Sequence, residues 1–234
     1  MPTVSESFRQ AYGLVVSGDA HLIGIVGLSL AISLTATLIA ACVALPVGAA
    51  LAIARFPGRA AVVATLNALM GLPPVVVGLA IYLLLSRSGP LGAFGLLFTP
   101  TAMVVAQSVL VAPIVAALTR QVVEDAWADY REQLTSLGAR TLDAALTLLW
   151  DTRYALATVL LAGFGRAIAE VGAVIIVGGN IDGVTRVMTT AIALETSKGD
   201  LGLALGLGLV LIAIVLLLNG AAHLVKDAAE RRYG

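Results

Sequence analysis

The sequence predicts an all-α integral membrane protein, a single domain over residues 1–234 with about five transmembrane helices. Three observations predict it. Hydrophobic residues make up 59% of the 234 positions, charged residues make up 12%, and the mean hydropathy is +1.00. Uncharged stretches alternate with short charged segments, and several are long enough to cross the roughly 30 Å hydrocarbon core of a bilayer. One long polar segment, Glu124–Asp151, interrupts this pattern. This composition excludes an ordinary soluble domain, and the net charge of zero gives no argument for nucleic acid as a partner.

Residues 1–20 form an N-terminal segment ahead of the first span. Within Ser5–Val16, the apolar residues Phe8, Tyr12 and Val15 stand among polar ones. This pattern fits a short helix lying along the membrane surface, and a frayed tail is the alternative that stays open. The segment lacks a basic start followed by an apolar core and a small-residue cleavage site, so no cleaved signal peptide is expected.

The five stretches predicted to span the membrane are Leu22–Ala54, Ala60–Ser86, Thr99–Gln121, Tyr154–Val177 and Leu201–Val225. Pro46 is expected to bend the first, and Pro113 the third. The second contains Gly71-Leu72-Pro73-Pro74, which is expected to break the helix in midspan. A packing kink and a lining of a transport pathway are both open interpretations of that break.

The polar segment, taken as residues 124–152, has its own apolar pattern. Leu134 and Leu137 share a helical face, Gly138 is a natural helix-ending residue, and Thr141 is able to cap a new start. The apolar stripe then resumes at Leu142, Ala145, Leu146 and Leu149. We therefore expect two short amphipathic helices bent at a glycine. An apolar stripe in water needs a partner, either other helices of this chain or another protein.

The distribution of basic residues predicts the orientation in the membrane. On the side of the polar segment fall Arg55, Arg59, Arg120, Arg131, Arg140, Arg153, Lys226, Arg231 and Arg232, and the opposite side has Arg9, Arg87, Arg186 and Lys198. By the positive-inside rule, the polar segment and the C-terminus lie in the cytoplasm, and with five spans the N-terminus lies outside.

The run Glu132–Ala139 resembles the cytoplasmic signature of the membrane (permease) subunits of ATP-binding-cassette importers. That signature is Glu-Ala-Ala, three residues and Gly, followed later by Leu-Pro. Glu132 and Gly138 match it, Gln133 and Leu134 replace the alanines, and Trp150-Asp151 stands in place of Leu-Pro. Gly163–Ala173 and Gly178–Arg186 resemble the molybdate and tungstate permeases, the tungstate group most of all.

This resemblance implies the type I importer permease fold, in a multi-pass protein of a bacterial or archaeal cytoplasmic membrane. It also implies three partners: a second copy of the chain in a homodimer, a cytoplasmic ATP-binding-cassette ATPase dimer, and an external substrate-binding protein. The bent helix pair would be the coupling element that docks on the ATPase. The residues implied in coupling are Glu132, Leu134, Leu137, Gly138, Ala139 and Leu142.

The candidate pathway or gate residues are Arg166, Glu170, Gly178, Gly179, Asn180, Thr185, Arg186, Thr189 and Thr190. Arg166 and Glu170 are the only charges inside an otherwise apolar span, four residues apart on one expected helix face, where they are able to pair. A structural pair between helices and a pair at the gate are both open. In the following segment, adjacent glycines, threonine hydroxyls and Arg186 are groups able to bind a tetrahedral oxyanion. The alternative is an ordinary external turn followed by a short re-entrant helix.

The sequence contains no nucleotide-binding loop of the type Gly-x-x-x-x-Gly-Lys-Ser/Thr. We therefore expect a non-catalytic transport subunit that binds no cofactor, with ATP and Mg used by the partner ATPase. Tungstate is the expected cargo, and molybdate is the alternative. An ion-coupled carrier without an ATPase would need ionisable groups on several spans, and a membrane hydrolase would need a midspan histidine near Ser33 or Ser108. No metal site is expected.

Overall fold

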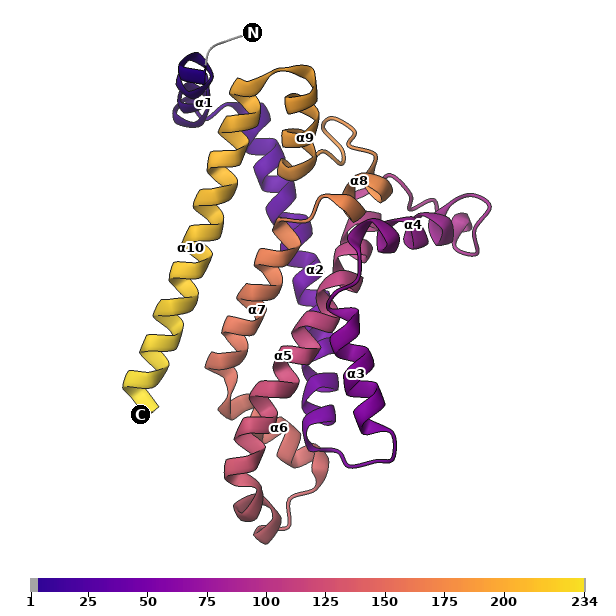
Figure 1. The fold of residues 1–234 in the computed structure, drawn as a ribbon, viewed down its shortest axis with the longest axis vertical. Coiled ribbons are helices and arrows are strands. Elements are labelled where there is room, and N and C mark those ends of the chain that lie inside the picture. Colours follow the sequence, from indigo (N-terminus) through magenta and orange to yellow (C-terminus); the bar gives the residue numbers. More distant parts are fainter. Residues whose placement is uncertain (1–3, 234) are drawn as a thin grey trace. The chain divides into compact units, whose positions relative to one another are not determined.

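The computed structural model describes residues 4–233, which form helices and loops with no β-strand among them. Figure 1 shows the order of the elements. They are α1 (Val4–Ser17), α2 (Ala20–Ile53), α3 (Arg59–Leu69), α4 (Pro74–Leu85), the 3-10 helix η1 (Gly92–Phe94), α5 (Pro100–Ser136), α6 (Thr141–Asp151), α7 (Arg153–Ile168), α8 (Gly172–Gly178), α9 (Met188–Lys198) and α10 (Leu201–Tyr233). The predicted all-α class is confirmed.

By length and composition, three described helices are able to cross a membrane, and up to five spans result if two broken helix pairs are counted. The three are α2, α5 and α10. The break predicted at Gly71–Pro74 is confirmed, because α3 ends at Leu69 and α4 begins at Pro74. Both α2 and α5 continue through an internal proline, Pro46 and Pro113 respectively.

Two expectations about helix boundaries were wrong. The third span and the first half of the polar segment are a single helix, α5, of 37 residues. The fourth span is interrupted, since α7 ends at Ile168 and α8 begins at Gly172. Glu170 lies in this interruption, where its Oε1 accepts a hydrogen bond of 3.2 Å from the backbone N–H of Ala173. Arg166 lies in the last turn of α7. The two charges therefore do not share one continuous helix face.

The described residues fall into two compact units. Unit 1 contains residues 4–36, 73–107 and 167–218, and unit 2 contains residues 37–72, 108–166 and 219–233. The helices α2 and α5 each contribute their two halves to different units. Each unit is described below by itself.

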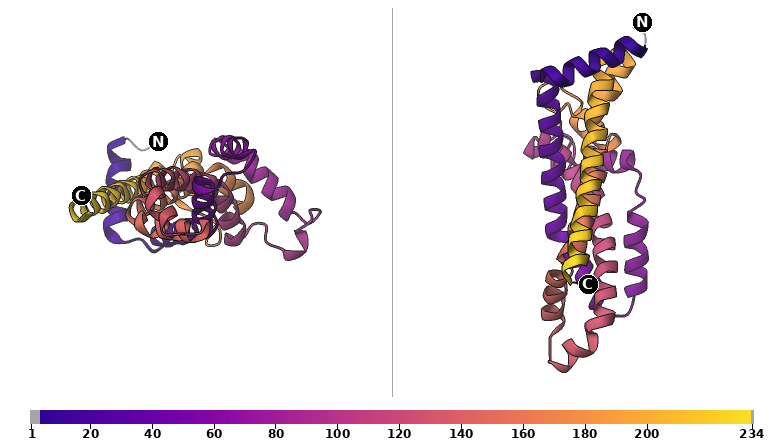
Figure 2. Two further views of the ribbon diagram at one scale, coloured as in Figure 1. Left: turned by 90° about the horizontal axis from the view of Figure 1, so that it is seen from below. Right: turned by 90° about the vertical axis from the view of Figure 1, so that its left-hand side faces the viewer.

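In unit 1, α1 crosses the N-terminal ends of α2 and α10 at a wide angle (Figure 2). This confirms a helix, rather than a frayed tail, at residues 4–17. A small residue allows α1 to approach α10 closely, because a Cβ at Gly202 would lie 2.6 Å from Oε1 of Gln10. Elsewhere in unit 1, α4 packs against α8, and a Cβ at Gly78 would lie 2.7 Å from Cα of Ala173.

In unit 2, α6 packs against the adjoining ends of α2 and α5. The buried cluster that joins them consists of Ala49, Ala52, Ile53, Val123, Ala144, Ala145 and Leu148. Most of these residues are small, which allows helix backbones to approach closely. The axis of α6 is bent by 76° from that of α7, with the break at Thr152. The helix α6 therefore does not extend the span formed by α7.

Candidate functional site

The turn between α5 and α6 is fixed by backbone geometry that requires glycine. Gly138 has a φ of 72°, in the left-handed region. Its N–H donates to the carbonyl of Thr135 at 3.1 Å, and the N–H of Ala139 donates to the carbonyl of Leu134 at 3.0 Å. This pair of bonds is the Schellman motif that ends many helices. The predicted role of Gly138 as the helix-ending residue is confirmed.

The start of α6 differs from the expectation in a detail. Thr141 is the first helical residue, and Arg140 occupies the capping position before it. The carboxylate of Asp143 accepts a hydrogen bond of 3.4 Å from the backbone N–H of Arg140. The predicted cap at Thr141 was therefore wrong. Asp143, in the first turn of α6, bonds back to the N–H of the capping residue, as the third residue of a capping box does.

The apolar residues of this segment divide into an inner and an outer set. Leu134 and Leu149 pack against the buried cluster of unit 2, to which Ala145 belongs. The outer set, called the exposed stripe here, is Leu137, Leu142, Leu146 and Trp150, whose exposed fractions are 82%, 69%, 59% and 72%. Three of its members are four residues apart on α6, so they follow one helix face.

Leu134 and Leu137 differ in their surroundings. Leu134 packs against the buried cluster, whereas Leu137, the residue after the end of α5, is 82% exposed, although its N–H still donates to the carbonyl of Gln133 at 3.1 Å. Among the other expected coupling residues, Glu132 is exposed and Ala139 is half-buried. All of these residues lie within six positions of Gly138 in the sequence. The segment thus has an anchored inner face and an open apolar outer face.

The candidate pathway residues after α8 are held by a dense set of internal hydrogen bonds. The hydroxyl of Thr185 is fully buried, donates to the carbonyl of Gly178 at 2.6 Å and accepts from the N–H of Ile181 at 2.9 Å. The amide nitrogen of Asn180 donates to the carbonyl of Thr190 at 3.3 Å. Thr185 therefore closes the loop from Gly178 upon itself.

The remaining candidates also have protein partners. The hydroxyl of Thr189 donates to the carbonyl of Glu170 at 2.8 Å, and that of Thr190 accepts from the N–H of Val187 at 3.1 Å. Arg186 forms an ion pair of 3.0 Å with Asp182. Both threonines are buried, so their hydroxyls organise the loop. Gly179 and Asn180 have positive φ values of 71° and 52°, as a tight turn requires. The short helix expected after this turn is α9.

Two buried polar residues of unit 1 belong to the same region and have no counterpart in the sequence-based set. Gln107 on α5 donates through Nε2 to the carbonyl of Ala167 at 3.0 Å, and Ser29 on α2 accepts from the N–H of Met188 at 2.8 Å. Both side chains are almost completely buried. The sequence did contain a signal for both residues: a polar side chain within an uncharged span needs a hydrogen-bond partner inside the protein.

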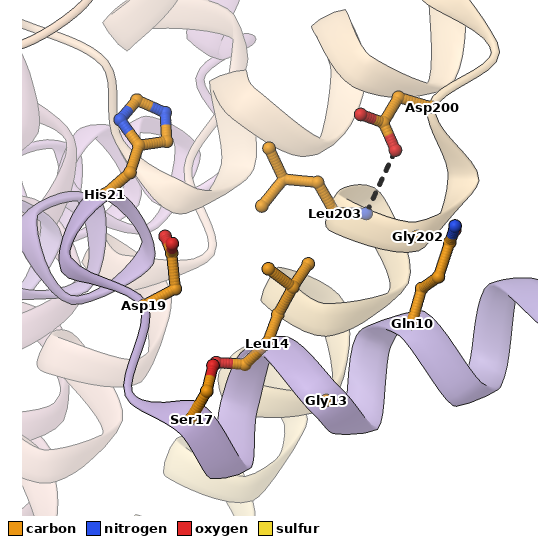
Figure 3. A pocket seen from close by; sticks show the side chains of 9 residues that line it. All are labelled: Gln10, Gly13, Leu14, Ser17, Asp19, His21, Asp200, Gly202 and Leu203. Carbon is orange, nitrogen blue, oxygen red and sulfur yellow. Dashed lines mark hydrogen bonds between the residues drawn. The ribbon is translucent and has the colours of Figure 1, made fainter.

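A cavity of about 600 Å³ lies at the end of unit 1 where α1, α2 and α10 meet. Figure 3 shows Asp19, His21 and Asp200 among its lining residues. The two carboxylates cap helices, because Asp19 accepts from the N–H of Leu22 at 2.9 Å and Asp200 from that of Leu203 at 3.3 Å. Among the described residues, no three metal-ligating side chains come together.

Sequence comparison with known proteins relates this chain to transport proteins. The chain is 40% identical over 219 residues to a probable anion ABC transporter permease protein of Haloferax volcanii, covering 92% of this chain and 94% of that one. It is 40% identical over 227 residues to the tungstate uptake system permease protein TupB of Peptoclostridium acidaminophilum, covering 97% of this chain and all of that one. It is 32% identical over 200 residues to the molybdenum transport system permease protein ModB of Mycobacterium tuberculosis, covering 77% and 72% of the two chains. No protein-family model matches the chain.

Proposed function

Because this chain belongs to the ABC transporter permease proteins, we propose that it forms the membrane-spanning pathway of an ATP-driven oxyanion importer, with tungstate as its cargo. The observation that carries the proposal is the exposed stripe on a rigidly anchored α6. A permease with no nucleotide-binding loop needs a surface through which a separate ATPase acts on it.

The proposed coupling surface has the features of a helix that docks in a groove. Leu142, Leu146 and Trp150 present apolar side chains at four-residue spacing, which is the pattern of helix-in-groove recognition. Burying one such leucine contributes about 1.5–3 kcal/mol. The buried cluster beneath α6 joins it to α2 and α5. Movement of the ATPase against the stripe would therefore be transmitted to these two helices.

In the proposed complex, the ATPase dimer binds ATP and Mg and carries out the hydrolysis. Two copies of this chain enclose the pathway, and a separate external protein delivers the anion. Closure of the ATPase dimer would displace α6 and switch access to the pathway from one face of the membrane to the other. The excess of arginine on the side of α6 supports the assignment of that side to the cytoplasm.

Tungstate is favoured over molybdate as the cargo because the relative named for tungstate uptake shares 40% identity and that named for molybdenum transport shares 32%. In this proposal the loop from Gly178 to Thr190 is a passage and gate, held in shape by its threonines. An ion-coupled carrier is not favoured, because it would place ionisable groups on several spans.

The test is anion-stimulated ATP hydrolysis in reconstituted vesicles that contain this chain, its ATPase and the external receptor. We expect stimulation by tungstate to exceed that by molybdate, and sulfate to have little effect. Uptake without ATP by the chain alone would overturn the importer proposal. Equal stimulation by tungstate and sulfate would overturn the choice of cargo and leave the coupling model in place.

A further inference from the structure

We propose that unit 2 contains a binding site for the phosphate group of an anionic phospholipid, in a cavity between the α2–α3 turn and α5. The cavity has a volume of about 420 Å³. Its lining residues are Ala52, Ile53, Ala54, Arg55, Arg59, Glu124, Trp127, Ala128 and Arg131. The site is remote in sequence from the loop of candidate pathway residues, and it shares Ala52 and Ile53 with the buried cluster beneath α6.

The cavity carries an excess of positive charge. Three arginines and one glutamate line it. Both carboxylate oxygens of Glu124 are already engaged, one with Arg59 at 2.9 Å and the other with Arg120. Arg55 and Arg131 are exposed and form no ion pair with any described side chain. Two guanidinium groups at the cavity are thus available to an anionic ligand, and guanidinium is well suited to phosphate.

One wall of the cavity is preorganised. The turn after α2 places Gly58 at a φ of 88°, and Arg59 follows directly. The Nε–H of Arg59 donates to the carbonyl of Leu51 at 2.9 Å, near the end of α2. This bond satisfies one of the carbonyls that a helix end leaves free, and the ion pair with Glu124 fixes the rest of the guanidinium. A ligand would therefore meet a cationic wall that needs little reorganisation.

The apolar surroundings favour a lipid over a free anion. Ile53 and Trp127 contribute apolar surface to the lining, and tryptophan is enriched at the level of lipid headgroups. On α2, Val43 and Val47 are exposed, and with Leu51 they repeat every four residues toward Arg55. This row offers a path for an acyl chain that ends beside the cationic cavity. Basic pockets between transmembrane helices commonly bind anionic headgroups.

The lipid-site proposal depends on the proposed function in one respect: the chain must span a membrane so that the cavity lies at the lipid headgroups. It needs neither the ATPase nor the transported anion. Lipid retention by the purified full-length chain tests it, so failure of the transport proposal and failure of the lipid site have different readouts.

The experiment measures phosphatidylglycerol retained by the chain, by native mass spectrometry after extraction from vesicles of phosphatidylglycerol and phosphatidylcholine. The double variant Arg55→Ala/Arg131→Ala should retain roughly tenfold to thirtyfold less phosphatidylglycerol, at about fivefold for each arginine near the surface. The control Arg9→Ala/Arg87→Ala removes the same charge from exposed positions outside the cavity and should retain it as the parent does. Arg59 is left intact because it supports the turn.

Three outcomes decide the proposal. A selective loss in the cavity variant, recovered in Arg55→Lys/Arg131→Lys, supports it and excludes misfolding as the cause. Equal retention by the cavity variant and the control overturns it. A third arm adds inorganic phosphate to vesicles of phosphatidylcholine alone. If inorganic phosphate binds the parent chain there and the double variant Arg55→Ala/Arg131→Ala loses this binding, the cavity is a site for free oxyanions. That result overturns the lipid assignment.

Discussion

The side-chain oxygen of Ser29 on α2 lies 2.8 Å from the backbone nitrogen of Met188, the first residue of α9. Ser29 also donates to the carbonyl of Ile25 at 2.7 Å. One hydroxyl thereby satisfies an N–H at the start of a buried helix that has no partner within its own helix. This contact ties α9, which follows the loop of candidate pathway residues, to α2 inside unit 1.

Ser29→Ala should lower the free energy of unfolding by about 1–3 kcal/mol, because it leaves the buried N–H of Met188 without a partner. Denaturant unfolding in mixed micelles measures the loss. Ser197→Ala is the matched control, since its exposed hydroxyl bonds only to the carbonyl of Leu194 in the same helix. If both variants unfold alike, the Ser29 contact is not a stabilising one.

A positive charge on the exposed stripe should weaken association with the ATPase. We expect Leu146→Lys and Leu137→Lys to reduce the affinity about tenfold or more, since each loses the burial of a leucine. Ser197→Lys adds the same charge to an exposed position on α9, outside the segment that carries the stripe. Copurification with the ATPase and tungstate uptake are the readouts. Wild-type affinity in both leucine variants would show that the stripe faces something else.

Replacement of Gly138 should act through the backbone rather than through crowding. A Cβ at Gly138 meets no atom within 4 Å, but its φ is 72°. Gly138→Ala should therefore cost about 1–2 kcal/mol of conformational strain, and Gly138→Pro, which also loses the bond to Thr135, should abolish coupling. Unfolding and ATPase association are measured on the same preparations.

Gly165→Ala is the control for this change. Gly165 has equal space for a Cβ but lies within α7, where alanine is the better helix former. It should be neutral or stabilising by about 0.5–1 kcal/mol. Similar losses in both glycine variants would argue against a special role for the left-handed turn.

The contact between α4 and α8 should not tolerate one added methyl group. In Gly78→Ala, the new Cβ would lie 2.7 Å from Cα of Ala173, a backbone atom that cannot rotate away. We expect a loss of about 1–3 kcal/mol, measured by thermal unfolding in micelles. Gly208→Ala, where a Cβ meets nothing within 4 Å, should leave the melting temperature almost unchanged. Unchanged melting of the Gly78 variant would mean that the two helices separate freely.

Local chemistry made some features predictable from the sequence. The break between α3 and α4 follows from two prolines, whose rings prevent a continuous helix, and the end of α5 follows from the conformational freedom of Gly138. The length of α5 was not predictable in the same way. The polar residues after Glu124 indicate where the chain meets water. They do not indicate whether α5 ends there or continues into water.

The roles of the candidate pathway residues were not predictable from the sequence, because their hydrogen-bond partners lie several residues away along the chain. The hydroxyl of Thr189 bonds to the carbonyl of Glu170, and that of Thr185 to the carbonyl of Gly178. From composition alone, the same threonines fitted an anion site equally well, since a hydroxyl serves either purpose. Helical periodicity also gave no sign that Leu137 is exposed while Leu134 packs against the buried cluster.

The 37 residues of α5 amount to a rod of roughly 55 Å at about 1.5 Å per residue, whereas a bilayer with its headgroups is about 40–45 Å thick. An upright helix of this length has to protrude into water. Its protruding end would place the turn at Gly138 beyond the headgroups, where a soluble ATPase is able to reach it.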